Sequence, residues 1–240
     1  VITDCPPTKD HLTIIASLNH LTSLTLAQCD LSDISPLANA QRLEYLDLSY
    51  NSIGNISYIC SLPNLKQLYL SHNALTDLTN LSGLKTLEIV DVSYNSLTSV
   101  SSVCNNLGLQ KLYASNNLIY SIGPLNNLPD LKVVDLSKNT LTNVSVLGHC
   151  ENLTEINISD NDLTDISTLS GLKNLRKLNC SNNSIKALPN WSKEVALVNL
   201  DASYNQISDL EPLRELPRLN VLNMDYNPEL SSVEPIVKCP

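Results

Sequence analysis

The side chains that could do chemistry include seven cysteines and four histidines, spread over a chain of 240 residues. Nucleophilic catalysis would need a base and an orienting group beside a nucleophile, and a metal centre would need clustered ligands. The chain has no CxxC or HExxH motif and no glycine-rich phosphate loop. The histidines share no motif; they are His11, His20, His72 and His149. We therefore expect no enzyme, no metal site and no cofactor.

Composition narrows the classes of partner. Hydrophobic residues make up 42% of the chain and charged residues 16%, which is enough apolar material for a continuous core. The longest apolar runs are far shorter than the roughly 18 residues that cross a bilayer. A formal net charge of -9 disfavours binding to a phosphate backbone. We thus expect no nucleic acid, no membrane insertion and no small-molecule substrate.

The elements that position the polar residues follow a 22-residue period that runs from Leu21 to Pro240 without an insertion. Each copy reads LxxLxLxxN, followed by apolar residues three apart. Its first part alternates apolar and polar residues, the signature of a strand with one buried side. The three-residue spacing that follows suits loops and short 3₁₀ turns. The ten copies start at Leu21, Leu43, Leu65, Leu87, Leu109, Leu131, Leu153, Leu175, Leu197 and Leu219.

One copy alone leaves apolar surface open on both sides, and stacking copies about 4.8 Å apart buries it. We therefore predict an α/β solenoid: a curved right-handed coil with a parallel β-sheet on the concave face and loops and short 3₁₀ turns on the convex face. Residues 1–20 are expected to form an N-terminal cap with a half repeat at Leu12, Ile15 and Leu18. Residues 21–240 form the ten repeats, of which the last merges into a truncated C-terminal cap at Val233 to Pro240.

Repeat position 9 is Asn in nine copies and Cys29 in the first. A buried Asn at the end of each strand can pair backbone groups that would cost about 1 to 3 kcal/mol each if left unpaired. We interpret this ladder of asparagines as structural, and we expect the first copy to be the least well held by hydrogen bonds. In the eighth copy Trp191 replaces Leu or Ile and is expected to fill the core, with a swelling of the coil at this point.

This pattern resembles the leucine-rich-repeat proteins of the short, 22-residue class, which includes the bacterial internalins and the regulatory subunit of protein phosphatase 1. The stretches Asp-Ile-Ser-Pro-Leu at 33–37 and Gly-Pro-Leu at 123–125 are similar to internalin repeats. The resemblance covers about 92% of the chain by the extent of its repeats. It implies a solenoid that binds a partner, but the fold hosts many partners.

The face predicted to bind is formed by repeat positions 3, 5 and 8, which point away from the core or flank the strand. Seven of the nine tyrosines occupy these positions. Tyrosine offers a large contact area with a polar tip at little cost in conformational entropy. The alternative is that tyrosine is only common filler at the strand edge. The predicted partner-binding residues are Tyr45, Asp47, Tyr50, Tyr69, His72, Asp91, Tyr94, Tyr113, Asp135 and Lys138. A basic group is expected to be solvated charge; it comprises Lys111, Lys132, Lys138, Arg176 and Lys177.

The resemblance leaves the cellular compartment and the role of the protein open between two alternatives. The scattered cysteines are interpreted as small core residues in a reducing compartment, which favours a cytoplasmic scaffold or regulatory subunit. Alternatively, Cys5 and Cys29 could form a disulfide in an N-terminal cap, which would indicate a location outside the cell. The Ser-Pro-Leu and Gly-Pro-Leu sequence motifs favour a surface or secreted adhesin of internalin type. Because the chain begins at Val1 without Met or a leader, we expect a fragment, so it could also be the targeting arm of an enzyme.

Overall fold

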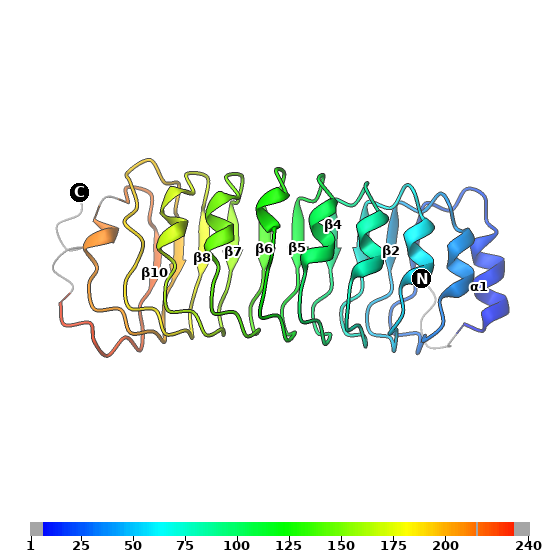
Figure 1. The fold of residues 1–240 in the computed structure, drawn as a ribbon, viewed down its shortest axis with the longest axis horizontal. Helices are drawn as coiled ribbons and strands as arrows, with labels where there is room; N and C mark the ends of the chain where they lie inside the picture. Colours follow the sequence, from blue (N-terminus) through cyan, green and yellow to red (C-terminus); the bar gives the residue numbers. More distant parts are fainter. Residues whose placement is uncertain (1–6, 215, 233–240) are drawn as a thin grey trace.

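The computed structural model describes residues 7–214 and 216–232 and contains one sheet of ten parallel strands (Figure 1). Strand order in the sheet is the order in the chain, so each repeat adds one strand beside the previous one. The strands are β1 (Ser23–Thr25), β2 (Tyr45–Asp47), β3 (Gln67–Tyr69), β4 (Ile89–Asp91), β5 (Lys111–Tyr113), β6 (Val133–Asp135), β7 (Glu155–Asn157), β8 (Lys177–Asn179), β9 (Asn199–Asp201) and β10 (Val221–Asn223).

The register of the sheet repeats the period of the sequence. Leu46 of β2 is the partner of Leu68 in β3, which in turn is the partner of Val90 in β4. Every pairing joins residues 22 positions apart, so each repeat position forms a row across the strands. A row is therefore either wholly in the core or wholly on the concave face, because successive side chains of a strand point to opposite sides.

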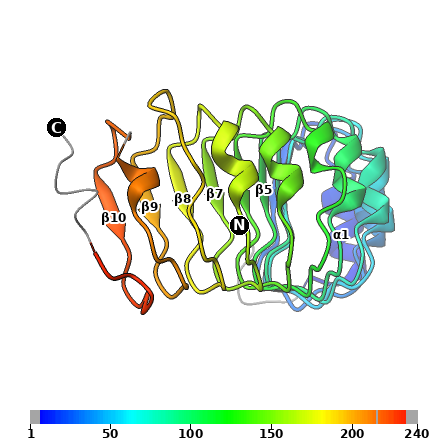
Figure 2. The same cartoon turned by 60° about the vertical axis from the view of Figure 1, so that its left-hand side comes forward.

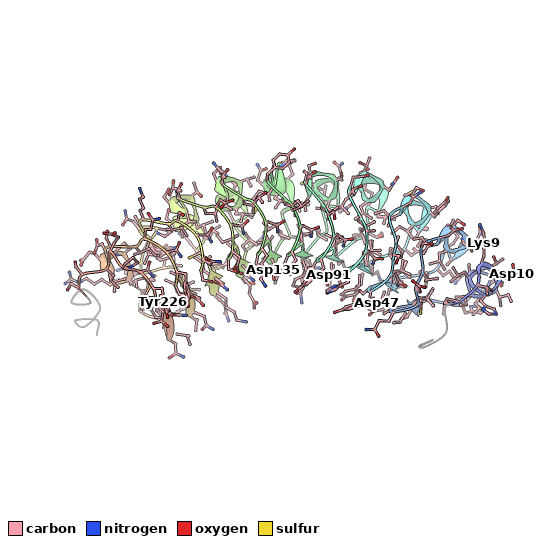
Figure 3. All side chains as sticks on the ribbon, turned by 90° about the horizontal axis from the view of Figure 1, so that it is seen from below. Lys9, Asp10, Asp47, Asp91, Asp135 and Tyr226 are labelled. Atoms are coloured by element: carbon pink, nitrogen blue, oxygen red, sulfur yellow. The ribbon has the colours of Figure 1, made fainter. Side chains whose placement is uncertain are left out.

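Short 3₁₀ helices form the convex side, where apolar residues three apart match three residues per turn. Figure 3 shows the resulting arch, with these turns on its outer side and the strands on its inner side. The helices are η1 (Ser35–Asn39), η2 (Ser57–Ser61), η3 (Thr79–Gly83), η4 (Ser101–Asn105), η5 (Leu125–Asn127), η6 (Ser145–His149), η7 (Ser167–Gly171) and η8 (Glu211–Leu213). The predicted fold class is thus confirmed.

The interior is one continuous column of leucine, isoleucine and valine between the sheet and the 3₁₀ helices. Leu68 and Leu70 of the third repeat are fully buried, as is Leu81 on η3. Each such side chain contributes about 1.5 to 3 kcal/mol relative to exposure. The described residues share no single globular centre, and stability depends on contacts between adjacent repeats.

The asparagines at repeat position 9 form the expected ladder. The side-chain amide of Asn139 donates to the carbonyl oxygens of Ala114, Leu136 and Ser137 at 3.0 to 3.1 Å. Its Oδ1 accepts from the backbone N–H of Ile119 at 2.9 Å. One asparagine thus pairs backbone groups of its own repeat and of the repeat before it.

The backbone of the first copy is hydrogen-bonded by an asparagine of the second copy. Asn51 accepts from the backbone N–H groups of Cys29 and Leu31 and donates to the carbonyl of Leu26. The Cys29 thiol donates to the carbonyl of Ala27 at 3.3 Å. The backbone at the end of β1 is therefore paired despite the missing asparagine.

The N-terminal segment contains the helix α1 (Lys9–Ala16), which packs on η1. Thr8 caps it, because its side chain accepts from the backbone N–H of His11. Leu12 and Ala16 are buried against the first repeat, while Leu18 is 54% exposed. Leu12, Ile15 and Leu18 therefore do not form one buried row, and a capping role for residues 1–20 remains a proposal.

The eighth repeat departs from the others. Residues 180–198, all of which the structure describes, contain no 3₁₀ helix between β8 and β9. Trp191 is only 5% exposed in this segment, which confirms it as core filler. At the other end Leu230 is partly buried against the core. The predicted C-terminal cap at Val233 to Pro240 lies outside the described residues.

Candidate binding face

Repeat position 5 places a row of alternating carboxylates and phenol rings along the concave face. Register pairs Asp47 with Tyr69, Tyr69 with Asp91, Asp91 with Tyr113, and Tyr113 with Asp135. All five side chains are partly exposed. Figure 3 shows Asp47, Asp91 and Asp135 on the inner side of the arch. We call these five residues of β2–β6 the Asp–Tyr row.

The aspartates of this row are held in place by the chain itself. One carboxylate oxygen, Oδ1, accepts the backbone N–H of the serine two residues later, in a local turn. Distances are 2.9 Å from Ser49 to Asp47, 2.9 Å from Ser93 to Asp91 and 3.0 Å from Ser137 to Asp135. A carboxylate whose orientation is already fixed loses little entropy when it binds a partner.

The tyrosines between them sit in a partly dehydrated, negative environment. The ring of Tyr69 contacts that of Tyr45 with centroids 5.4 Å apart and planes tilted by 42°. Partial burial raises the pKa of Tyr69, and the charges of Asp91 and Asp47 act in the same direction. Burial likewise raises the pKa of Tyr113, helped by Glu155, Asp91 and Asp135. Both rings are half-buried platforms rather than mobile surface groups.

Repeat position 8 forms a second row at the edge of the sheet, beyond the strand ends. His72 stacks between Tyr50 and Tyr94, with centroids 4.1 and 3.9 Å away and planes within 13°. Tyr50 is 51% exposed and Tyr94 is 45% exposed. A matching pair at the other end, Tyr204 and Tyr226, stacks at 4.3 Å. Continuous aromatic surface therefore runs along two parts of this edge.

Backbone geometry explains the regular stacking. Every residue at position 8 is left-handed, with φ between 53° and 57°, although none is glycine. This conformation costs roughly 1 to 2 kcal/mol for ordinary residues. It is maintained by backbone hydrogen bonds to the next repeat, since the backbone N–H of Tyr50 donates to the carbonyl oxygen of Ser71 and that of His72 to the carbonyl oxygen of Ser93. Identical backbone at a fixed spacing makes adjacent rings parallel.

The predicted site residues thus divide between two surfaces. Tyr45 and the Asp–Tyr row lie on the concave strands, while Tyr50, His72, Tyr94 and Lys138 belong to the edge row. Lys138 has no ring neighbour in its row, because Asn116 and Asp160 flank it. The residues from β2 to β6 therefore form a continuous face, with Lys138 at one margin.

A hollow that sequence reasoning missed lies over the C-terminal half of the concave face. It measures about 560 Å³ and is lined by β5 to β10, including Val133, Glu155, Lys177 and Val221. Figure 2 shows these strands side by side toward the C-terminus. Lys177 pairs with Glu155 at 3.1 Å. From β7 to β10 position 5 carries only the short side chains of Asn157, Asn179, Asp201 and Asn223, whereas position 3 includes the long side chains of Glu155 and Lys177. The absence of a ring at position 5 after Tyr113 was the available sequence signal.

The basic residues do not form one patch. Lys132 and Arg176 line a second hollow of about 550 Å³ on the flank, together with Lys173 and Arg218. Lys173 pairs there with Glu194 at 2.7 Å. Lys111 and Lys177 belong instead to the concave strands β5 and β8.

The side chains of the concave face and of the edge row can form hydrogen bonds, ion pairs and ring contacts with a partner. In the part of the chain that the structure describes, no three His, Cys, Asp or Glu residues are arranged to hold a metal ion. Cys60, Cys104, Cys150 and Cys180 have free thiols, of which only that of Cys60 is exposed. The bridge considered between Cys5 and Cys29 involves Cys5, which lies outside the described residues. Burial raises the pKa of Cys104 and of Cys150 to about 11, which lowers their reactivity.

Comparison with known proteins places the chain in a family. The model of the family described as leucine-rich repeats (2 copies) matches residues 41–83, 63–105, 108–149, 151–193 and 195–238. The chain therefore belongs to the leucine-rich-repeat family. Members of this family are generally non-catalytic binding modules, commonly for other proteins. No curated protein matches the chain by sequence.

Solved structures show where the likeness is strong. An internalin, InlF, from Listeria monocytogenes is 30% identical with a TM-score of 0.85, and the match covers 88% of this chain and 63% of InlF. The internalin InlC2 from the same species is 25% identical with a TM-score of 0.71, over 90% of this chain and 84% of InlC2. A complex of TLR13 with the RNA ssRNA13 is 26% identical with a TM-score of 0.73, over 90% of this chain and 34% of TLR13.

The described helices also bear on the membrane question. None of them, between residues 7 and 232, has both the length and the apolar character that crossing a bilayer requires.

Proposed function

We propose that this chain is a non-catalytic interaction module that binds another protein on its concave face, as a scaffold or regulatory subunit. The Asp–Tyr row carries this proposal. It combines anchored carboxylates with half-buried rings, and both lie on an open face that no other element of the described chain covers. Anchored polar groups and aromatic platforms are the features that dominate binding energy in protein interfaces.

The size of the face fits a protein partner. Ten strands about 4.8 Å apart give an arc of roughly 45 Å. A specific interface needs about 800 Å² on each partner, which such an arc can present. Charge disfavours RNA as the ligand, because the net charge is -9 and the Asp–Tyr row is acidic.

An adhesin of internalin type is the second candidate, favoured by the match to InlF at 30% identity and a TM-score of 0.85. The same match favours a cell-surface or secreted setting over the cytoplasmic one. The free thiols do not oppose this, because three of the four are buried and poorly reactive. The chain spans 63% of the length of InlF. A third candidate, the targeting arm of an enzyme, is tested by reading the full-length sequence for a catalytic domain.

The test is a comparison of captured partners between the wild type and a Tyr69→Ala/Tyr113→Ala variant. The matched control is Tyr58→Ala/Tyr120→Ala, which removes two exposed tyrosines outside the strands. Truncation of the two interface rings should weaken binding by more than about 30-fold, since a single hot-spot residue contributes at least about 2 kcal/mol and the two effects need not add in full. The control variant should still capture the partners that the wild type captures. Equal capture by all three proteins, or equal loss from both variants, would overturn the proposal.

A further inference from the structure

The Asp–Tyr row has a spacing that selects for the conformation of its ligand. Carboxylates recur at every second strand, and rings occupy the strands between them. Adjacent strands lie about 4.8 Å apart, so like groups recur every ~9.6 Å along the solenoid axis. The concave curvature brings side-chain tips slightly closer than the backbones that carry them (Figure 3).

Among regular backbones, the polyproline II helix matches this period best. It has three residues per turn and rises about 3.1 Å per residue, so one edge presents a side chain every ~9.3 Å. A β-strand presents side chains on one face every ~6.6 Å. An α-helix presents side chains on one face every three to four residues, or ~5.4 Å, so side chains seven residues apart, on every second turn, recur at ~10.5 Å and drift out of phase over the length of the row.

Two separate features of the face agree on the chemistry of such a ligand. Aromatic-lined surfaces are the usual docking sites for polyproline II segments, because flat rings pack against the ridges of this helix. Tyr69 and Tyr113 supply such rings. The carboxylates of Asp47, Asp91 and Asp135 would attract cations that recur at the same ~9.6 Å spacing. Guanidinium groups pair with carboxylates especially well.

The charge balance of the face supports a basic ligand. Positions 3 and 5 of β2 to β6 carry the charges of Asp47, Asp91, Asp135 and Lys111, so the net charge there is -2, from three carboxylates and one ammonium. Burial is the main cause of the raised pKa values of both tyrosines, and the neighbouring carboxylates act in the same direction. An acidic peptide would meet repulsion along most of this row.

We propose that the concave face of β2–β6 binds a partner-protein segment in polyproline II conformation that carries Arg or Lys at every third residue. The segment runs along the solenoid axis, across the strands, with its cations on the three aspartates and its intervening residues against Tyr69 and Tyr113. This inference rests on the proposed function and specifies the chemistry of the partner.

The experiment titrates the whole chain with a labelled peptide of four Arg-Pro-Pro triplets, followed by fluorescence anisotropy. An isomeric peptide with the four arginines contiguous has the same charge and composition but the wrong period. The triplet peptide should bind at least about tenfold more tightly, and its affinity should fall as salt screens the exposed pairs. A third peptide, with Glu in place of Arg, should show no binding.

The aspartates are tested by Asp91→Asn/Asp135→Asn, which removes charge but retains the local turn. Asparagine already holds this place in β7 and β8, where Asn157 accepts from Ser159 at 3.3 Å and Asn179 from Ser181 at 3.0 Å. The double variant should bind the triplet peptide about five- to tenfold more weakly, as the loss of two exposed ion pairs implies. Asp201→Asn is the matched control, because Asp201 makes the same serine contact in β9, outside the row.

Equal affinity for the two arginine peptides would overturn the inference, since charge alone would then explain binding. Absence of binding by the triplet peptide, or the same effect from Asp201→Asn as from the double variant, would do so too. If the peptide fails while Tyr69→Ala/Tyr113→Ala still loses natural partners, the proposed function stands and only the ligand chemistry is wrong.

Discussion

At the scale of single residues, the position-9 asparagines connect each repeat to the one before it. Asn139 is buried and pairs four backbone groups in two repeats. Alanine cannot replace any of these contacts, and water has little access to the groups left behind. Each unpaired buried group costs about 1 to 3 kcal/mol, partly relieved by local rearrangement.

We therefore expect Asn139→Ala to lower the free energy of unfolding by about 3 kcal/mol or more, measured by urea denaturation. Asn126→Ala is the control, because Asn126 is exposed on η5. This control should change stability by less than about 0.5 kcal/mol. Similar effects from both substitutions would show that the ladder is not a main source of cohesion.

The buried thiols give stability a dependence on alkaline pH. Desolvation raises the pKa of Cys180 to about 12, with a further contribution from Asp201, against an ordinary value of 9.0. Below pH 9 both folded and unfolded chains keep this proton. Between about pH 9 and 12 the unfolded chain loses it and the folded chain does not, so stability falls as pH rises.

The expected contribution of Cys180 is a loss of about 1.4 kcal/mol per pH unit above its unfolded pKa. Urea denaturation of the wild type and Cys180→Ala between pH 8 and 10.5 isolates it, because other titrating groups are common to both proteins. The wild type should fall more steeply. Parallel curves would mean that the thiol is not protected by the core.

At the scale of elements, the segment from β8 to β9 shows how one repeat can lose its 3₁₀ helix. Trp191 fills the space instead, and its indole N–H is the buried side-chain group that lacks a hydrogen-bond partner in the described chain. Its backbone N–H donates to Pro189 at 2.9 Å, which fixes the turn. The large ring thus replaces the packing that a helix and a leucine provide in other repeats.

We expect Trp191→Ala to cost about 3 to 5 kcal/mol, since it leaves a cavity between two repeats. Trp191→Phe should cost less than about 1.5 kcal/mol, because the smaller ring also removes the unpaired N–H. Far-UV circular dichroism during urea denaturation measures both variants, as neither retains a tryptophan. Comparable losses from the two substitutions would indicate that the indole N–H has a partner, such as bound water.

At the scale of the whole molecule, periodicity explains how much could be predicted. A 22-residue period predicts the parallel register, the buried rows of leucine and the Asn139-type ladder, because each repeat repeats the environment of the last. The 3₁₀ helices follow from apolar spacing. These features depend on local pattern alone, and the structure confirms them.

Other features depend on particular side chains at particular repeats. The helix α1 depends on Thr8 and His11, which form a capping box ahead of Leu12. The stack of Tyr50, His72 and Tyr94 requires the left-handed backbone, which the sequence does not mark with glycine. The C-terminal hollow depends on the relative sizes of side chains in neighbouring strands. None of these follows from the period.

The same periodicity makes whole repeats separable from the site. A variant lacking residues 87–108 loses β4 and Asp91, while a variant lacking residues 153–174 loses β7, outside the Asp–Tyr row. Each deletion removes one period and joins chemically equivalent positions, so both chains should fold. The urea m-value of each should drop by about one tenth, in proportion to the surface lost.

Ligand binding should separate these two chains. Deletion of 87–108 brings Tyr69 next to Tyr113, which breaks the alternation and puts the remaining aspartates out of phase with a three-residue period. Deletion of 153–174 leaves all five residues of the row in register. Fluorescence anisotropy should therefore show the Arg-Pro-Pro peptide bound by the second variant with near wild-type affinity and by the first at least about tenfold more weakly, as lost ion pairs and ring contacts imply. Equal affinities would mean that the peptide does not read the spacing of the row.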